Sequence, residues 1–187
     1  MALKRLTIDG YGQLELNQVA FRRDGRIEAQ CALNEDDFGP EANAVAENGM
    51  LLAVDRVNRE IKLPAADEDL PIALNYTTEH MYDERKNALK DFYLEYGTFY
   101  PRMGFLSVGE LFTTNCLAYD SSEFADDEAF ETALGKIDTT ALFGGISEEG
   151  AIKVSATAPQ VGPVLRLVEK TTMPDGQLAV KFQVNKA

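Results

Sequence analysis

Apolar and polar residues alternate along much of this chain, and the alternation predicts β-strands more often than helices. The clearest case is the stretch 164–184, where every second residue from Leu178 to Val184 is apolar. Side chains on a strand point alternately to its two faces, so this period of two indicates a strand with one covered face. Met173–Gly176 supplies a proline and a glycine that suit a β-turn. We therefore predict a hairpin over residues 164–184.

Two further hairpins follow from the same pattern. Residues 19–33 contain Asp24-Gly25, a pair favoured in two-residue hairpin turns, followed by alternating apolar positions from Ile27 to Leu33. Residues 50–64 contain Asp55–Asn58, a run with turn-forming residues between two apolar stretches. We predict that each of these stretches forms a pair of antiparallel strands.

Three other stretches, 72–76, 105–120 and 152–158, are also predicted to be strands. Within the second of them, both alternate faces of Glu110–Tyr119 are largely apolar. A strand that is apolar on both faces is covered on both faces, so this one is expected to lie inside the molecule. Its polar centre, Thr113-Thr114-Asn115, predicts a bend that is fixed by hydroxyl and backbone hydrogen bonds.

Two helices interrupt this β pattern. Residues 83–97 begin at a possible cap, Asp83, carry aromatic residues on one face and end at Gly97, although the end of this stretch equally suits a strand. Residues 126–135 have an acidic first turn and end at Gly135, which predicts a short surface helix.

These elements predict a mainly β fold, namely an antiparallel β-barrel or sandwich with one or two short helices and an extended N-terminal arm or hairpin. Residues 34–48 are acidic and contain few large apolar residues, so we interpret them as a linker or long loop. The expected organisation is an N-terminal arm with its hairpin and acidic linker at 1–47, followed by the β-barrel or sandwich domain at 48–187.

The chain is strongly acidic, with 31 acidic residues against 18 basic residues and a net charge of −13. This charge is sufficient to maintain solubility, and it also repels phosphate groups. We therefore expect neither direct nucleic-acid binding nor binding to a membrane. The N-terminus has no apolar signal region and no apolar run approaches the length of a transmembrane helix, so synthesis in the cytoplasm is expected.

Combinations of residues that support catalysis or bind metals are sparse. His80 stands between acidic residues, which suits either a general base or a solvated loop histidine, and no nucleophile motif lies beside it. Asp120–Glu131 has the acidic ends of a calcium-binding loop but has Phe124 where a ligand belongs. Cys31 and Cys116 lie in strand-like runs and are expected to be reduced core thiols, although pairing between them stays open. We expect no cofactor, no metal and no enzymatic activity.

Two groups of residues suit contact with a partner protein. Three arginines flank Asp24-Gly25, and they are either exposed turn residues or contacts to an acidic partner. Six aromatic residues between Phe92 and Phe105 exceed what one short strand or helix buries alone, so this segment is either central to the core or meets another subunit. The residues predicted to bind a partner are Arg5, Phe21, Arg22, Arg23 and Arg26 in the N-terminal segment and Tyr93, Tyr96, Phe99, Tyr100 and Arg102 in the aromatic segment.

Two stretches within residues 48–120 resemble small virion structural proteins of tailed bacteriophages: GMLLAVDRVNREIKLP and FYPRMGFLSVGELFTTNCLAYD. In that family a strand, a short turn and a second strand precede a strand of the type G-[DE]-x-F-T-T-N. The resemblance implies a capsid decoration or cement protein, which binds the major capsid protein or copies of itself on the outside of the virion and stabilises the shell.

Two other functions stay open. The virions of tailed bacteriophages also contain tail and neck structural proteins, some of which form rings. A carbohydrate-binding or hydrolytic β-protein is a third possibility, because carboxylate pairs such as Asp126-Asp127 are used in glycoside hydrolysis. Self-assembly into rings in solution favours the second function, and turnover or glycan binding favours the third.

Overall fold

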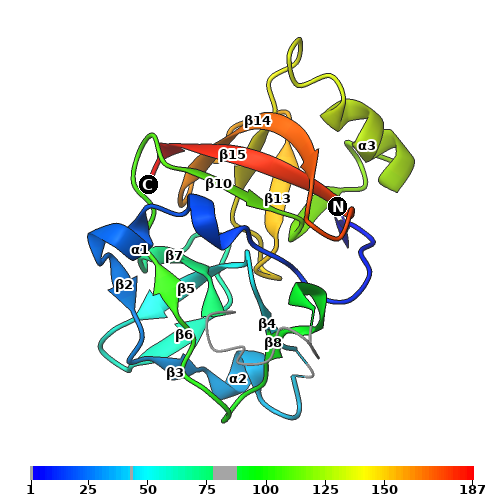
Figure 1. Cartoon of the computed structure of the whole chain (residues 1–187). Coiled ribbons are helices and arrows are strands. Elements are labelled where there is room, and N and C mark those ends of the chain that lie inside the picture. Colours follow the sequence, from blue (N-terminus) through cyan, green and yellow to red (C-terminus); the bar gives the residue numbers. More distant parts are fainter. Residues whose placement is uncertain (1, 43, 78–87) are drawn as a thin grey trace.

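The protein is mainly β and its sheets are stacked. The structure is a computed structural model that describes residues 2–42, 44–77 and 88–187. These residues form a seven-stranded, a six-stranded and a two-stranded sheet, joined by turns and short helices. Figure 1 shows the largest sheet above the two smaller ones. The predicted mainly β fold is confirmed, and the arrangement is consistent with a sandwich.

The strands of each sheet are named in their spatial order. The largest sheet contains β1 (Leu3–Arg5), β11 (Leu117–Asp120), β13 (Ile152–Ser155), β12 (Phe143–Gly145), β14 (Val164–Thr172), β15 (Leu178–Lys186) and β10 (Leu111–Thr114). The six-stranded sheet contains β2 (Ile27–Glu28), β9 (Met103–Gly104), β7 (Ile72–Asn75), β5 (Leu51–Asp55), β6 (Glu60–Lys62) and β3 (Ala32–Leu33). The third sheet pairs β4 (Ala46–Glu47) with β8 (Tyr93–Leu94).

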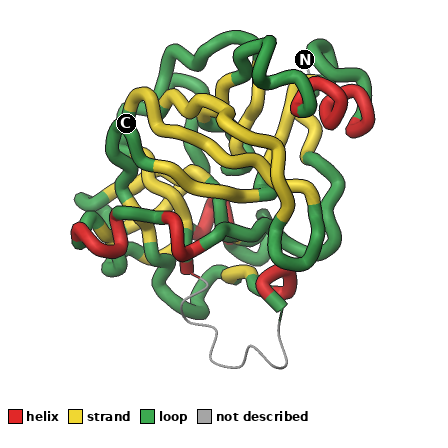
Figure 2. The backbone as a smooth tube through the Cα atoms, turned by 45° about the horizontal axis from the view of Figure 1, so that its top comes forward, coloured by secondary structure: helices red, strands yellow, loops and turns green. Residues whose placement is uncertain are grey.

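Short helices lie at the edges of these sheets. They are η1 (Leu16–Gln18), α1 (Phe21–Asp24), α2 (Glu35–Phe38), η3 (Leu89–Asp91) and α3 (Asp127–Leu134). In Figures 1 and 2, α3 lies at the outer end of the largest sheet, far from α1 and α2. No helix in the described part of the chain has the length and hydrophobicity that spanning a bilayer requires.

The core has two parts, and the six-stranded sheet lies between them. Successive residues of β5 point to opposite faces, so Leu51 packs into a cluster with the largest sheet while Leu52 and Val54 pack into a second cluster. β11 behaves in the same way, since Leu117 contributes to the first cluster and Ala118 to the second. Burial on both faces explains why neither strand has a polar face.

The predicted covered strand and its bend are confirmed. Every residue from 112 to 120 is buried, and the chain is split into β10 and β11 at Asn115. The Thr114 hydroxyl donates to the Gln13 carbonyl at 2.6 Å and accepts from the Cys116 N–H at 3.0 Å, while the Asn115 side chain accepts from the Gln13 N–H at 2.6 Å. β10 and β11 stand five places apart in the strand order, although only two residues separate them in sequence. The sheet therefore curls back on itself.

Two of the three predicted hairpins are confirmed. β14 and β15 pair in antiparallel register across a turn at Met173–Gly176, where Gly176 has a φ of 87°. β5 and β6 pair in the same way. The predicted strands at 72–76 and 152–158 correspond to β7 and β13, and the predicted helix at 126–135 corresponds to α3. Asp126 caps α3 by accepting the Ala129 N–H at 2.8 Å.

The hairpin predicted over residues 19–33 is wrong. Asp24-Gly25 ends the helix α1, in which Gly25 has a φ of 70° and the Arg26 N–H donates to the Phe21 carbonyl at 3.2 Å. The same left-handed glycine that suits a hairpin turn therefore serves as a helix C-cap. The residues after it pair elsewhere, β2 with β9 and β3 with β6.

The helix predicted over 83–97 is wrong where the structure describes it, and the alternative of a strand at the end of this stretch is confirmed. Residues 83–87 lie outside the described residues, η3 is a single 3₁₀ turn and Tyr93–Leu94 is the strand β8. β8 pairs with β4, so tertiary pairing has overridden a helical pattern in the last part of this stretch.

The N-terminal segment lies along the bend between β10 and β11. β1 pairs with β11, and Leu14 forms a β-bridge with Thr114. Leu6, Leu14 and Phe21 are buried in the first core cluster. The division of the chain at residue 47 stays a prediction, although strands from residues 1–47 pair in all three sheets.

Candidate functional site

Three arginines from two distant parts of the chain line one pocket. Its volume is about 400 Å³, and it lies between η1, α1 and β2 on one side and the ends of β7 and β9 on the other. We call it the arginine pocket, and its lining is Leu16, Val19, Arg22, Arg23, Ile27, Tyr76 and Arg102. The pocket thus combines guanidinium groups with an apolar wall.

α1 places the first two arginines at the pocket. Phe21 is completely buried and its ring centroid lies 4.9 Å from that of Tyr76, so the helix is held by its first residue. Arg22 and Arg23 follow on the exposed side of the same turn. The Arg22 guanidinium also donates to the Leu16 carbonyl at 3.1 Å, which fixes it over η1.

The pairing of β9 with β7 places the third arginine, which directly precedes β9. The Arg102 N–H donates to the Thr77 hydroxyl at 2.8 Å, and the Arg102 carbonyl accepts from the Tyr76 N–H at 2.9 Å. These two contacts fix the backbone at the wall of the pocket. Arg102 is therefore brought next to Arg22 and Arg23 by strand pairing.

Charge distinguishes this pocket from the rest of the molecule. The whole chain has a net charge of −13, whereas three arginines are among the described residues that line the pocket. Arg23 is exposed and forms no ion pair with any described residue.

Arg26, the remaining arginine of the predicted group, points elsewhere. Its guanidinium donates to the Phe105 carbonyl at 3.1 Å and pairs with Glu110 at 2.9 Å, and it also contacts Asp24. Glu110 in turn accepts the Phe21 N–H at 2.8 Å. This pair holds α1 against the loop after β9, so Arg26 stabilises the pocket without lining it. Sequence analysis had not singled out Glu110 for this role.

The structure corrects the assignment of Phe21 as a partner contact, because its exposed fraction is 0% and it packs in the core. Arg5 is largely covered, and its guanidinium pairs with Glu47 at 2.7 Å. The Tyr93 ring lies 4.3 Å from the Tyr11 ring, between the two-stranded sheet and the N-terminal segment. Arg5 and Tyr93 therefore make intramolecular contacts in this structure.

The aromatic segment provides a second exposed feature. Tyr96, Phe99 and Tyr100 have exposed fractions of 38%, 57% and 59%, and they lie in the connection from β8 to β9. We call residues 95–102 the aromatic loop. Gly97, with a φ of 77°, allows its turn, and the Thr98 hydroxyl donates to the Glu95 carbonyl at 2.7 Å. Strand pairing anchors both ends of the loop.

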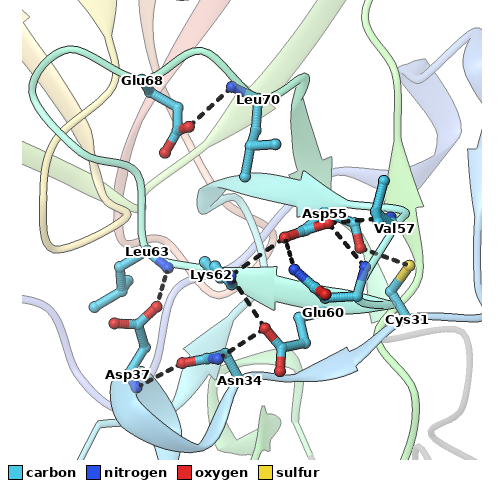
Figure 3. A network of polar contacts seen from close by, with 11 residues as sticks. Cys31, Asn34, Asp37, Asp55, Val57, Glu60, Lys62, Leu63, Glu68 and Leu70 are labelled. Atoms are coloured by element: carbon cyan, nitrogen blue, oxygen red, sulfur yellow. Dashed lines mark hydrogen bonds and ion pairs between the residues drawn. The ribbon is translucent and has the colours of Figure 1, made fainter.

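The carboxylates around β6 are used to hold turns. Asp55 accepts the N–H groups of Val57 and Asn58 at 3.0 Å each, and Lys62 reaches it at 3.3 Å (Figure 3). These contacts, the bonds from Asn58 first, lower the pKa of Asp55 to about 2. The Lys62 ammonium group also pairs with Glu60 at 3.1 Å. The group is a stabilising network around a hairpin.

The thiols are not poised for reaction. Cys31 and Cys116 are both buried and unpaired, which confirms the expected reduced core thiols. Burial raises the pKa of Cys116 to about 12, so the thiolate is not populated near neutral pH. His80 lies outside the described residues. No three metal-binding side chains come together within the described ranges.

The predicted acidic pair at α3 also has structural partners. Asp126 is the helix cap, and Asp127 accepts from the Tyr119 hydroxyl at 2.5 Å. A larger pocket of about 510 Å³ lies beside β12 and β13. Its lining includes both Lys153 and the carboxylates Asp120 and Glu148, so it does not select for one sign of charge.

Comparison with known proteins finds no family model, curated protein or solved structure that matches this chain.

Proposed function

We propose that this protein is a non-enzymatic structural protein of a tailed phage, which binds the outside of the capsid as a decoration or cement protein. The observation that carries the proposal is the aromatic loop, in which Tyr96, Phe99 and Tyr100 stand exposed on one anchored connection. Exposed aromatic residues that occur together are typical of protein-binding surfaces, because each buries a large rigid area on contact.

The anchoring of the loop supports this role. β8 is paired with β4 and β9 is paired with both β7 and β2, so the two ends of the loop are held by sheets. Tyr96 contacts Glu35 of α2 through its hydroxyl at 3.4 Å. A loop that is ordered before binding loses less conformational entropy on binding, which favours association.

The polar groups support binding rather than catalysis. The buried thiols, the turn-holding carboxylate Asp55 and the helix-capping carboxylate Asp126 all have structural roles. A decoration protein requires a stable β-core and a contact surface, and many copies on a shell add their modest individual affinities. The resemblance of residues 48–120 to virion proteins supplies the identity of the partner in this proposal, the major capsid protein.

The test is occupancy on capsids built from the major capsid protein of the genome that encodes this chain. The double variant Phe99→Ser and Tyr100→Ser is expected to reduce occupancy at least about tenfold, since aromatic hot spots contribute about 2 kcal/mol or more. Val168→Ser is the matched control, because Val168 is 42% exposed on β14 of the other sheet. Wild-type occupancy of the aromatic variant contradicts the proposal, and ring formation by the wild-type protein without capsids points instead to a tail or neck protein.

A further inference from the structure

We propose that the turn between β5 and β6 is a second contact with the partner protein, and that it fits an acidic surface with a small apolar hollow. The turn consists of residues 56–59, and we call it the β5–β6 tip. The identity of the partner as a capsid protein rests on the proposed function, whereas the chemistry of the contact rests on the tip itself.

The β5–β6 tip presents an apolar side chain to solvent. Val57 is 92% exposed, and the next most exposed large hydrophobic residue in the described part of the chain, Val108, is 69% exposed. All four residues of the tip are exposed, whereas every residue of β5 is buried. A partner that covers Val57 removes nearly the whole side chain from water, and this favours binding in proportion to the apolar area that is buried.

Hydrogen bonds hold the tip in one shape before a partner arrives. The Asp55 carboxylate accepts the N–H groups of Val57 and Asn58 at 3.0 Å each, and the Asn58 side chain donates to the same carboxylate at 2.8 Å. The Arg56 guanidinium pairs with Glu28 of β2 at 3.1 Å, which ties the tip to the edge of the six-stranded sheet. An ordered contact element loses less conformational entropy on binding than a flexible one.

Arg59 has a backbone conformation that glycine adopts more readily. Its φ is 57°, and no other residue except glycine has a positive φ in the described part of the chain. The left-handed conformation crowds the Cβ atom against the backbone, which costs folding free energy, and strain of this kind is concentrated at functional sites. Glycine at this position would relieve the strain, so we infer that the arginine serves binding rather than folding.

The Arg59 side chain supplies the charge of the contact. It is exposed, and its guanidinium group forms no hydrogen bond or ion pair with any described residue, in contrast to Arg56. An unpaired guanidinium group favours a carboxylate, which it binds through two parallel hydrogen bonds. One arginine on a chain with a net charge of −13 does not form the basic track that a phosphate backbone requires, so an acidic protein surface fits better than nucleic acid.

The β5–β6 tip and the aromatic loop lie at opposite ends of the six-stranded sheet. Leu51, at the start of β5, is paired with Leu74 of β7, and Leu74 is paired with Gly104 of β9. The aromatic loop enters β9 at Met103, so it joins the sheet where β5 begins, whereas the tip follows Asp55, where β5 ends. The two contacts are therefore separate, and each can be removed while the other stays in place.

The experiment measures the affinity of the full-length protein for the same capsids as above, together with the Tm of each variant. Val57→Ser removes the apolar contact and is expected to weaken binding about tenfold. Arg59→Gly removes the charge and is expected to weaken binding about tenfold as well. It is also expected to raise the Tm by about 2 °C, because it relieves the left-handed strain. A loss of binding with a gain in stability is not a result of misfolding.

Two matched controls accompany these variants. Val108→Ser changes the other strongly exposed valine, which lies in the turn before β10, and it is expected to leave binding unchanged. Arg59→Lys keeps the charge and the strained backbone but loses the planar fork of the guanidinium group. It is therefore expected to cause an intermediate loss of binding without a gain in Tm.

Several results overturn the inference. Capsid occupancy that depends on Phe99 and Tyr100 but is unchanged by Val57→Ser and Arg59→Gly refutes the second contact and leaves the proposed function standing. Equal weakening by Val57→Ser and Val108→Ser shows that the loss is not specific to the tip. A lower Tm of Arg59→Gly means that the arginine serves folding, and tight binding of a single-stranded oligonucleotide that Arg59→Gly abolishes assigns the tip to nucleic acid. Absence of any wild-type occupancy on capsids refutes the proposed function and this inference together.

Discussion

Gly104→Ala tests how α1 is attached to the six-stranded sheet. A Cβ added at Gly104 would lie 2.3 Å from the Phe21 ring, which is completely buried and therefore cannot swing into solvent. Ordinary contacts between carbon atoms are about 3.5–4.0 Å, so the ring and the strand would have to separate by more than about 1 Å. Overpacking of this kind costs about 1–3 kcal/mol of folding free energy.

The assay is unfolding in guanidinium chloride, followed by far-UV circular dichroism. This assay gives the free energy of unfolding directly. In thermal unfolding, a loss of about 2 kcal/mol corresponds to a fall in Tm of about 4–8 °C for a chain of this size. Phe21→Leu provides the matched background, because a smaller side chain leaves room for the new methyl group. In that background Gly104→Ala is expected to cost at least about 1 kcal/mol less than in the wild type.

Additive costs of Gly104→Ala and Phe21→Leu would refute a packing conflict between the two residues. Independent substitutions add to within about 0.5 kcal/mol, so an unchanged cost of Gly104→Ala in the Phe21→Leu background means that the two residues do not compete for the same space. A wild-type stability for Gly104→Ala alone also contradicts it.

Three further predictions concern acid stability, thiol reactivity and the N-terminus. The pKa of Asp55 is about 2 in the folded protein against an ordinary 3.8, so the stability that Asp55 contributes is present above pH 3.8 and is lost as the pH falls toward 2. Asp55→Asn should flatten this part of the pH dependence of stability, measured by urea unfolding. An unchanged pH profile contradicts this prediction. Cys31 and Cys116 are buried, so a disulfide reagent at mildly alkaline pH should modify both thiols only after unfolding. Rapid labelling of the native protein would contradict the burial of these two side chains. Deletion of residues 1–33 removes core side chains such as Leu14, so it should abolish cooperative unfolding. An unfolding midpoint equal to that of the wild type argues against a role of this segment in the core.

Local signals were sufficient where neighbouring residues alone decide the structure. The β14–β15 hairpin follows from a strict alternation and a proline–glycine turn, and both are properties of adjacent residues. α3 follows from the cap Asp126 and its acidic first turn. The burial of residues 112–120 also followed from the sequence, because a strand without a polar face has to be covered on both sides.

Local signals failed where a distant segment chose between two local structures. Asp24-Gly25 suits a hairpin turn and a helix C-cap equally well, and the choice was made by Phe21 packing against Tyr76. Tyr93–Leu94 suits a helix and a strand, and the choice was made by pairing with β4. In each case the deciding partner lies far away in sequence, so no window of neighbouring residues contains it.

The same division holds for the candidate site. By itself the sequence determined the chemistry, namely arginines on an acidic chain and an excess of aromatic residues. Only the tertiary structure decided which of them act together: it brought Arg102 to Arg22 and Arg23, turned Arg26 to Glu110 and buried Phe21. The physical reason is that residue type fixes charge and hydrophobicity, whereas proximity between residues 22 and 102 exists only after β9 has paired with β7 and β2.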